Sequence, residues 1–508
     1  MFSGRSTQPD AAKTGFETGT FFLLLALFLG SYLAVYLEFC GSLHRDESDQ
    51  IIFSQSLALG YHEQPPLYSW LTWAFFRILG RNLVALALLK TLILGSIYTG
   101  LYLSARLLLG DARRAALAAF SAFLMFSFAW HSISYLTHTN LLCAIFAGAC
   151  YAFLRLLRSG KWQEYLFLGL MLGLGMLSKY NFVLFGGALL LAGLMTRQLR
   201  ERLLNRRMVL ALAVAAAVVF PHGLFLAKHL DQLVAIKHKV CAEPCLTGFA
   251  WGGSSLVSNV LFSLTPLAFI GLIFFRQGTR LARDPESVAT SAVRFLERYF
   301  LTAFGLFLLV AAGGATYFCD RWLYPLVLLA PVYLFARLRG LEISISRLRR
   351  FGYLLAGGGL ILIVIRAGQL IMGGSSSCPY SLSSFAEAAG ELQMAGGPAA
   401  IMVASHRELG GNMCYWLPQM RHVCADRDLY LAGAQLARGP FVLIWDTVEG
   451  EVLPQTLRDF LLREFHLGVR PEEPVRFVQA KGRGGIPHRL GYMIVAPEMA
   501  ASAALEFR

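Results

Sequence analysis

Charged residues are scarce in this 508-residue chain. They make up 15% of it, whereas hydrophobic residues make up 56%. Water-soluble domains contain about 25% charged and about 45–50% apolar residues. The composition therefore excludes a water-soluble protein and predicts an integral membrane protein with several spans. The net charge is +14, but most arginines lie in short loops between apolar runs, which is typical of loops facing the cytoplasm. We therefore expect no nucleic-acid partner.

The chain also lacks the motifs of nucleotide-dependent enzymes, because it contains neither a P-loop nor a glycine-rich dinucleotide fingerprint. Its nine cysteines include no CxxC pair and no zinc-type spacing. Two groups of cysteines fall in regions that we place outside the cytoplasm, where oxidising conditions permit a disulfide within either group. These are Cys241 and Cys245 in one loop, and Cys378, Cys414 and Cys424 in the C-terminal part.

Eleven apolar runs predict eleven transmembrane helices. The first, residues 21–40, is long enough to cross a hydrocarbon core of about 30 Å. No small-x-small cleavage site follows it, so we expect a retained span rather than a signal peptide. The fifth and sixth runs are close enough in sequence to form a tight hairpin. The other ten runs lie near residues 83–103, 115–132, 139–155, 164–177, 181–196, 208–227, 257–275, 299–315, 323–336 and 351–372.

Arginine is concentrated in alternate loops, for example at Arg113–Arg114, Arg206–Arg207 and Arg349–Arg350. The intervening loops contain only scattered basic residues. The positive-inside rule places the arginine-rich set in the cytoplasm. Residues 1–20 are then cytoplasmic, and both the loop 41–82 and the C-terminus are external. The Ala/Leu/Arg-rich composition and the short loops favour a bacterial inner membrane, with the external side being the periplasm.

After residue 372 the composition changes. Residues 373–384, GGSSSCPYSLSS, resemble a linker, and short apolar runs then alternate with amphipathic stretches. Strands are predicted over 399–405, 441–446 and 492–497, and helices over 407–417 and 456–465. Such alternation is typical of a small α/β domain. The predicted fold is an all-α polytopic membrane domain over residues 21–372, followed by an extracytoplasmic α/β domain over residues 373–508.

The external loop 41–82 contains an unusual group of acids directly after the first span, including the adjacent pair Asp46 and Glu47. One interpretation is a solvated loop whose acids begin a helix. The other is an active-site loop, because acids at a membrane edge are costly unless they have partners or a function. We expect residues 48–60 to form an amphipathic interfacial helix. Pro65–Pro66 should end it and allow a second helix to begin.

Two basic residues in other external loops are also candidates for the site. Arg321 adjoins Asp320 in a short loop between two spans. It either forms a local pair with Asp320 or binds a phosphate at the headgroup level. Lys179 lies between the fifth and sixth runs. Histidines in these loops, taken singly, are more simply hydrogen-bonded or surface residues than ligands.

The external DE pair, followed by a GY-x-E-x-PPL stretch, resembles the GT-C glycosyltransferases that use polyprenyl-phosphate sugars. These include protein O-mannosyltransferases, aminoarabinose transferases of lipid A and galacturonosyltransferases of lipopolysaccharide. Residues 46–71, DESDQIIFSQSLALGYHEQPPLYSWL, carry most of the resemblance. Residues 173–185, GLGMLSKYNFVLF, and 320–331, DRWLYPLVLLAP, are similar to the same family.

This resemblance implies a transferase that moves a sugar from polyprenyl phosphate to a glycolipid, glycan or protein acceptor, with inversion at the anomeric carbon. It makes Asp46 the catalytic base and Glu47 the second member of the pair. Tyr61 and Glu63 match family positions that help to hold metal or lipid phosphate. Gln64 stands where the aminoarabinose transferases have a lysine, so the chain lacks one expected positive charge. Lys179 and Arg321 are the candidates to supply it.

The cofactor requirement stays open, because a divalent metal could be held by Glu63 together with His222 or His229. Three other functions compete with transfer. A secondary transporter would be expected to show repeats and mid-membrane charges, and a receptor would not need the acidic loop. A flippase for polyprenyl-linked glycans would handle the same lipid without transferring its sugar.

Overall fold

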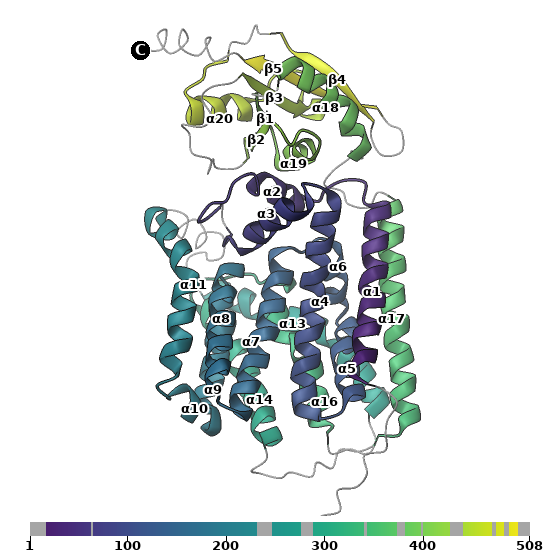
Figure 1. The fold of residues 1–508 in the computed structure, drawn as a ribbon, viewed down its shortest axis with the longest axis vertical. Helices are drawn as coiled ribbons and strands as arrows, with labels where there is room; N and C mark the ends of the chain where they lie inside the picture. The colour runs from purple at the N-terminus through teal and green to yellow at the C-terminus, as the bar shows by residue number, and fades with distance from the viewer. Residues whose placement is uncertain are drawn as a thin grey trace, which may run out of the picture.

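The computed structural model describes residues 17–61, 64–230, 246–275, 288–339, 343–372, 382–397, 400–426, 440–469, 474–481 and 487–495. A long helical bundle forms one end of the molecule and a small α/β domain forms the other, as Figure 1 shows. Two short helices, α2 (Arg45–Phe53) and α3 (Leu67–Leu79), lie between them. The predicted fold class is therefore confirmed.

Seven of the described helices are long and apolar enough to cross a membrane. The first, α1, has 22 residues and is about 33 Å long at 1.5 Å per residue, which matches the hydrocarbon core. The seven are α1 (Thr18–Phe39), α4 (Leu83–Leu109), α7 (His138–Arg158), α11 (Met208–Lys228), α13 (Leu246–Phe275), α14 (Val288–Ala312) and α17 (Ile345–Ile371).

Two helix pairs that are sharply bent raise the number of candidate spans to nine. In the first, α5 (Ala112–Phe120) and the 3₁₀ turn η1 (Ser121–Leu124) meet α6 (Phe126–Ser134) at 81°. In the second, α9 (Phe182–Met195) meets α10 (Arg197–Leu203) at 112°.

The two remaining predicted spans are helical but are not among these nine candidates. The helix α8 (Trp162–Ser178) has 17 residues. The run 323–336 is divided between α15 (Asp320–Leu328) and α16 (Ala330–Arg337), and Pro331 lies in the first turn of α16. Every apolar run is therefore helical, although α15 and α16 are each too short to cross a membrane alone.

The C-terminal domain contains a five-stranded sheet in the order β2-β1-β3-β5-β4. Strands β1 (Ile401–Ala404), β2 (Arg421–Cys424) and β3 (Phe441–Asp446) are parallel, whereas β4 (Arg476–Lys481) and β5 (Pro487–Val495) join antiparallel. One apolar core holds α18 (Leu382–Gly396) and α19 (Arg407–Trp416) against the sheet, and a second holds α20 (Gln455–Phe465). The first core also includes Ile52 of α2.

The disulfide expectation is wrong for one pair. Cys414 and Cys424 are free and buried, so they do not form a bridge. Cys241, Cys245 and Cys378 lie outside the described residues.

Candidate active site

The helix α2 begins immediately after the first span and holds both acids of the DE pair in its first turn. The Glu47 carboxylate accepts a hydrogen bond from the backbone N–H of His44 at 2.9 Å, which satisfies one of the donors left free at the helix start. Negative side chains in the first turn also interact favourably with the helix dipole. The sequence therefore fixes where α2 begins.

The helix ends at Phe53, well before the predicted end at residue 60. The Ser54 hydroxyl donates to the carbonyl of Ile51 at 3.0 Å, and the Gln55 side chain donates to the carbonyl of Ile52 at 2.8 Å. Such side-chain bonds to the local backbone compete with further helix. Pro65–Pro66 therefore does not end α2, although α3 does begin directly after Pro66.

Glu47 is buried and its carboxylate is fully used by neighbouring helices. One oxygen accepts from the Tyr36 hydroxyl at 2.7 Å and from the Lys90 ammonium at 2.8 Å. Lys90 also donates to the carbonyl of Ser134 at 3.2 Å. Burial opposes ionisation of Glu47, but Lys90, Tyr36 and the His44 amide outweigh it and lower its pKa to about 2. Such a carboxylate is a weak proton acceptor, so we interpret Glu47 as a residue that positions α2.

Asp46 lies in a different environment, although it is the next residue. It is half-buried, and its side chain has no hydrogen bond or ion pair within the described part of the chain. Its negative charge nevertheless acts on Lys179, Arg321 and Tyr135, which come from three other segments. The Asp46 carboxylate therefore has no competing partner there, and two cations, Lys179 and Arg321, lie within electrostatic range of it.

Lys179 follows α8 and donates to the Thr139 hydroxyl at 2.8 Å. Burial is the largest influence on its pKa, and the charge of Arg321 adds to it, so the pKa is lowered although Asp46 opposes the shift. The side chain is therefore a desolvated cation whose charge is balanced only in part. Such a group gains from binding a phosphate.

The sequence left open whether Arg321 pairs with Asp320, and the structure shows that the two side chains do not form that pair. Asp320 accepts only the backbone N–H of Arg321, at 2.7 Å. Its carboxylate instead bonds to the hydroxyls of Ser127 and Tyr324 and lies 3.2 Å from His131 Nδ1. Asp320 thus fixes the start of α15, and the exposed Arg321 side chain interacts instead with the Cys319 thiol and with the charge of Asp46.

The structure does not bring the other family positions to Asp46. The Tyr61 hydroxyl donates to the carbonyl of Ser56 at 2.7 Å and accepts from the Ala58 amide at 3.1 Å, so it closes its own loop. Gln64 is half-buried, and its amide oxygen has no hydrogen-bond partner among the described residues. Glu63 lies outside the described residues.

The possible metal ligands are not gathered in the part of the chain that is described. There, no three His, Cys, Asp or Glu side chains converge as a metal site would require. His222 uses its two ring nitrogens for the Tyr180 hydroxyl at 3.1 Å and the Leu59 carbonyl at 3.0 Å. His229 lies against the Phe225 ring instead.

The contribution of Lys90, which holds Glu47, was not predicted from the sequence. The sequence does contain an indication of this role. Lys90 is the one charged residue in the run 83–103, and charged residues inside membrane spans are usually paired and functional. The contact between the C-terminal domain and α2 was not predicted either. There, the Arg407 guanidinium lies 2.7 Å from Asp49, and the Asn412 side chain accepts from the Leu43 amide at 3.1 Å.

Residues 63–225 match the family model described as dolichyl-phosphate-mannose-protein mannosyltransferase. The chain is 30% identical to the lipopolysaccharide core galacturonosyltransferase RgtB of Rhizobium johnstonii, covering 93% of this chain and 96% of the relative. It is also 30% identical to RgtA of the same organism, covering 94% and 97%.

Among solved structures, the fold resembles that of ArnT from Cupriavidus metallidurans bound to undecaprenyl phosphate. The TM-score is 0.64 at 12% sequence identity, and the match covers 94% of this chain and 98% of ArnT. At that identity the likeness concerns the fold alone. It extends over both the helical bundle and the small C-terminal domain.

Proposed function

Because this chain belongs to the family of the lipopolysaccharide core galacturonosyltransferases, we propose that it transfers galacturonic acid from a polyprenyl phosphate to a lipopolysaccharide core. That the chain is a multi-span membrane glycosyltransferase, and not a flippase, follows from the family itself. The sugar, the lipid carrier and the acceptor are the proposed parts. The names of the relatives support the sugar and the acceptor, and the undecaprenyl phosphate bound to ArnT supports the carrier.

The observation that carries the chemical part of the proposal is the contrast between the two acids. Asp46 has a free carboxylate, whereas Glu47 is held by Tyr36 and Lys90. In the proposed step, an acceptor hydroxyl attacks the anomeric carbon of the donor and its proton passes to Asp46. The bond between that carbon and the phosphate oxygen breaks, and polyprenyl phosphate leaves. A positioned base typically contributes about 10²–10⁴ to the rate of such a step.

The leaving phosphate gains negative charge in the transition state, and cations placed beforehand stabilise that charge. Lys179 and Arg321 are the residues we assign to this role, because both interact electrostatically with Asp46. A galacturonic acid donor carries a carboxylate besides its phosphate. Two separate cations suit such a donor, although Gln64 replaces the lysine of the aminoarabinose transferases.

We also propose that the site faces the periplasm from the inner membrane. The arginine-rich loops support this orientation, since they would lie in the cytoplasm at the end of the bundle opposite α2. Single cysteines introduced at exposed positions of the two ends would be tested with a membrane-impermeant thiol reagent in intact spheroplasts. Labelling at the α2 end, and none at the opposite end, is the expected result.

Transfer would be measured with the purified full-length protein, polyprenyl-phosphate galacturonic acid and lipopolysaccharide lacking core galacturonate. Mass spectrometry would detect the product. Asp46→Asn should reduce the rate by about 10²–10⁴. Asp111→Asn is the matched control, because Asp111 caps α5 by accepting from the Arg114 amide and asparagine caps equally well. Transfer by Asp46→Asn at more than a tenth of the wild-type rate would contradict the base assignment.

The donor is tested by substituting one component at a time. A nucleotide-linked galacturonic acid should give no product, and a polyprenyl phosphate carrying a neutral hexose should react poorly. Efficient transfer from the nucleotide-linked sugar would overturn the assignment of the carrier. NMR of the product should show inversion at the anomeric carbon.

A further inference from the structure

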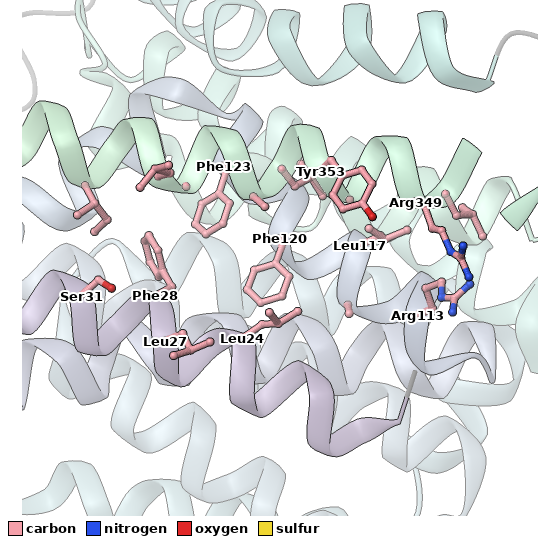
Figure 2. A pocket seen from close by; sticks show the side chains of 18 residues that line it. Leu24, Leu27, Phe28, Ser31, Arg113, Leu117, Phe120, Phe123, Arg349 and Tyr353 are labelled. Atoms are coloured by element: carbon pink, nitrogen blue, oxygen red, sulfur yellow. The ribbon is translucent and has the colours of Figure 1, made fainter. Parts of the chain in front are cut away.

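A cavity of about 560 Å³ lies between α1, α5 and α17 at the edge of the bundle. In Figure 1, α1 and α17 stand side by side there. The cavity is far from Asp46 in the fold, because α5 and the start of α17 lie at the end of the bundle opposite α2. Its walls are apolar and aromatic, and include Leu24, Phe28, Phe120, Phe123 and Leu360. Figure 2 shows Leu24, Phe28, Phe120 and Phe123 along a groove between the helices.

Two arginines close one end of this groove. Arg113 is the second residue of α5, and Arg349 lies near the start of α17. Their guanidinium groups lie next to each other in Figure 2. Within the described residues, neither has an ion pair with a carboxylate. Adjacent guanidiniums repel each other, and the N-terminal ends of the two helices add partial positive charge. The arrangement is therefore complementary to an anion with several acceptor oxygens.

The groove itself fits a lipid chain. Leu24, Leu360 and Tyr353 contribute to its walls and are exposed in the isolated molecule, so an apolar surface must cover them in the membrane. From Arg349 to Ile363, α17 rises about 21 Å at 1.5 Å per residue. One leaflet of the hydrocarbon core is about 15 Å thick, since the whole core is about 30 Å. The groove therefore extends from the headgroup level through the depth of one leaflet.

We propose that this groove binds an anionic glycerophospholipid of the membrane. The phosphate lies between Arg113 and Arg349, and one acyl chain lies against Phe120 and Phe123. The site is separate from the proposed donor site, because its phosphate position is at the other membrane surface. The bound lipid would contact α1, α5 and α17 together, because residues of all three helices line the groove.

Native mass spectrometry of the full-length protein in detergent tests this proposal. The protein would be titrated with phosphatidylglycerol and with phosphatidylcholine of the same acyl chains, and the bound lipid would be counted. Arg113→Gln combined with Arg349→Gln should weaken phosphatidylglycerol binding about thirty-fold, as expected from two charges at a membrane surface. Arg200→Gln combined with Arg206→Gln is the matched control. These two arginines are exposed elsewhere, and their loss should leave binding unchanged.

A second variant tests the groove without changing charge. Ala356 lines the cavity, and Ala356→Trp should fill it and prevent binding of phosphatidylglycerol. Three results would overturn the proposal: equal binding of both lipids by the wild type, unchanged binding by the double arginine variant, or displacement of phosphatidylglycerol by equimolar polyprenyl phosphate. Asp46→Asn should bind phosphatidylglycerol as the wild type does, so failure of the proposed transfer reaction would leave this test valid.

Discussion

The Arg407 guanidinium of the C-terminal domain lies 2.7 Å from the Asp49 carboxylate of α2, and both side chains are buried. Asp49 is one helical turn beyond Asp46, the proposed base. The small domain is therefore attached directly to the helix that carries the site. Its role, which the sequence left open, includes holding this helix in place.

Replacing Arg407 should damage both stability and transfer. Burial and the neighbouring acids raise the pKa of Asp49 to about 9, which weakens its ion pair with Arg407. Arg407→Gln removes this partner from a buried acid, and leaving such a group unsatisfied typically costs about 1–3 kcal/mol. Thermal unfolding in detergent measures this change. Arg197→Gln is the control, because Arg197 and Glu201 form an exposed pair of the kind that contributes little. Equal unfolding temperatures for the two variants would contradict our interpretation of the Asp49–Arg407 pair.

The close approach of α19 to α2 gives a second prediction. A Cβ atom added at Gly411 would lie 2.3 Å from the Cβ of Ser48. Gly411→Ala should therefore push the two helices apart and destabilise the protein by about 1–3 kcal/mol. Gly390→Ala in α18 has open space around it and should be neutral or slightly stabilising. Hydrogen exchange of the α2 amides should increase in the Gly411 variant and remain unchanged in the Gly390 variant.

Glu47 should contribute stability that depends on pH. Its pKa falls from 4.5 to about 2 on folding, so the folded state favours the ionised form by about 3 kcal/mol. This contribution is fully present above pH 4.5 and is lost as the pH falls toward 2. The free energy of unfolding of Glu47→Gln should therefore be well below that of the wild type at pH 7. The difference between the two, measured by denaturation over a range of pH, should narrow as the pH decreases. Adding Lys90→Met should restore part of the loss, because it removes the stranded buried charge. A difference in the free energy of unfolding that does not change with pH would contradict the claim that ionised Glu47 stabilises the fold.

Lys179 should make donor binding sensitive to alkaline pH. Burial lowers its pKa below the usual value of 10.5, so its charge is present at neutral pH and is lost earlier than that of an exposed lysine. The KM for the polyprenyl-phosphate donor should rise as this proton dissociates. Lys179→Arg should keep its charge and remove that rise, while kcat measured with saturating donor changes less. An unchanged alkaline profile in Lys179→Arg would show that another group titrates.

Much of the fold was predictable because membrane helices are specified by local composition. All eleven apolar runs are helical, and α3, α19, β3 and α20 lie where turn residues and periodicity place them. The strands β2 and β4 were not predicted. Four residues such as Arg421–Cys424 carry no clear alternation, and they form a strand because they pair in parallel with β1. Pairing of this kind depends on distant residues and is not visible in a local pattern.

The candidate site was predictable only in part, because local sequence shows which acids are present but not which distant residues pack against them. Local sequence identified the DE pair, and Asp46 lies within electrostatic range of Lys179 and Arg321. It did not distinguish Asp46 from Glu47, because that difference is made by Tyr36 and Lys90 on other helices. Nor did it show that Asp320 would turn away from Arg321 toward Ser127 and Tyr324. These partners are set by the packing of the bundle.

Ile52 belongs to the apolar core of the C-terminal domain, although it lies only five residues after Glu47. Segments that are distant in sequence therefore form one packing unit, since Ile52, in the loop after the first span, completes a core made mostly of residues beyond 381. A chimera that joined this bundle to the sheet of a relative at residue 373 would leave the new sheet against a foreign α2. To preserve packing, the exchanged unit should include α2 together with the distant C-terminal segment, as two discontinuous pieces of one module.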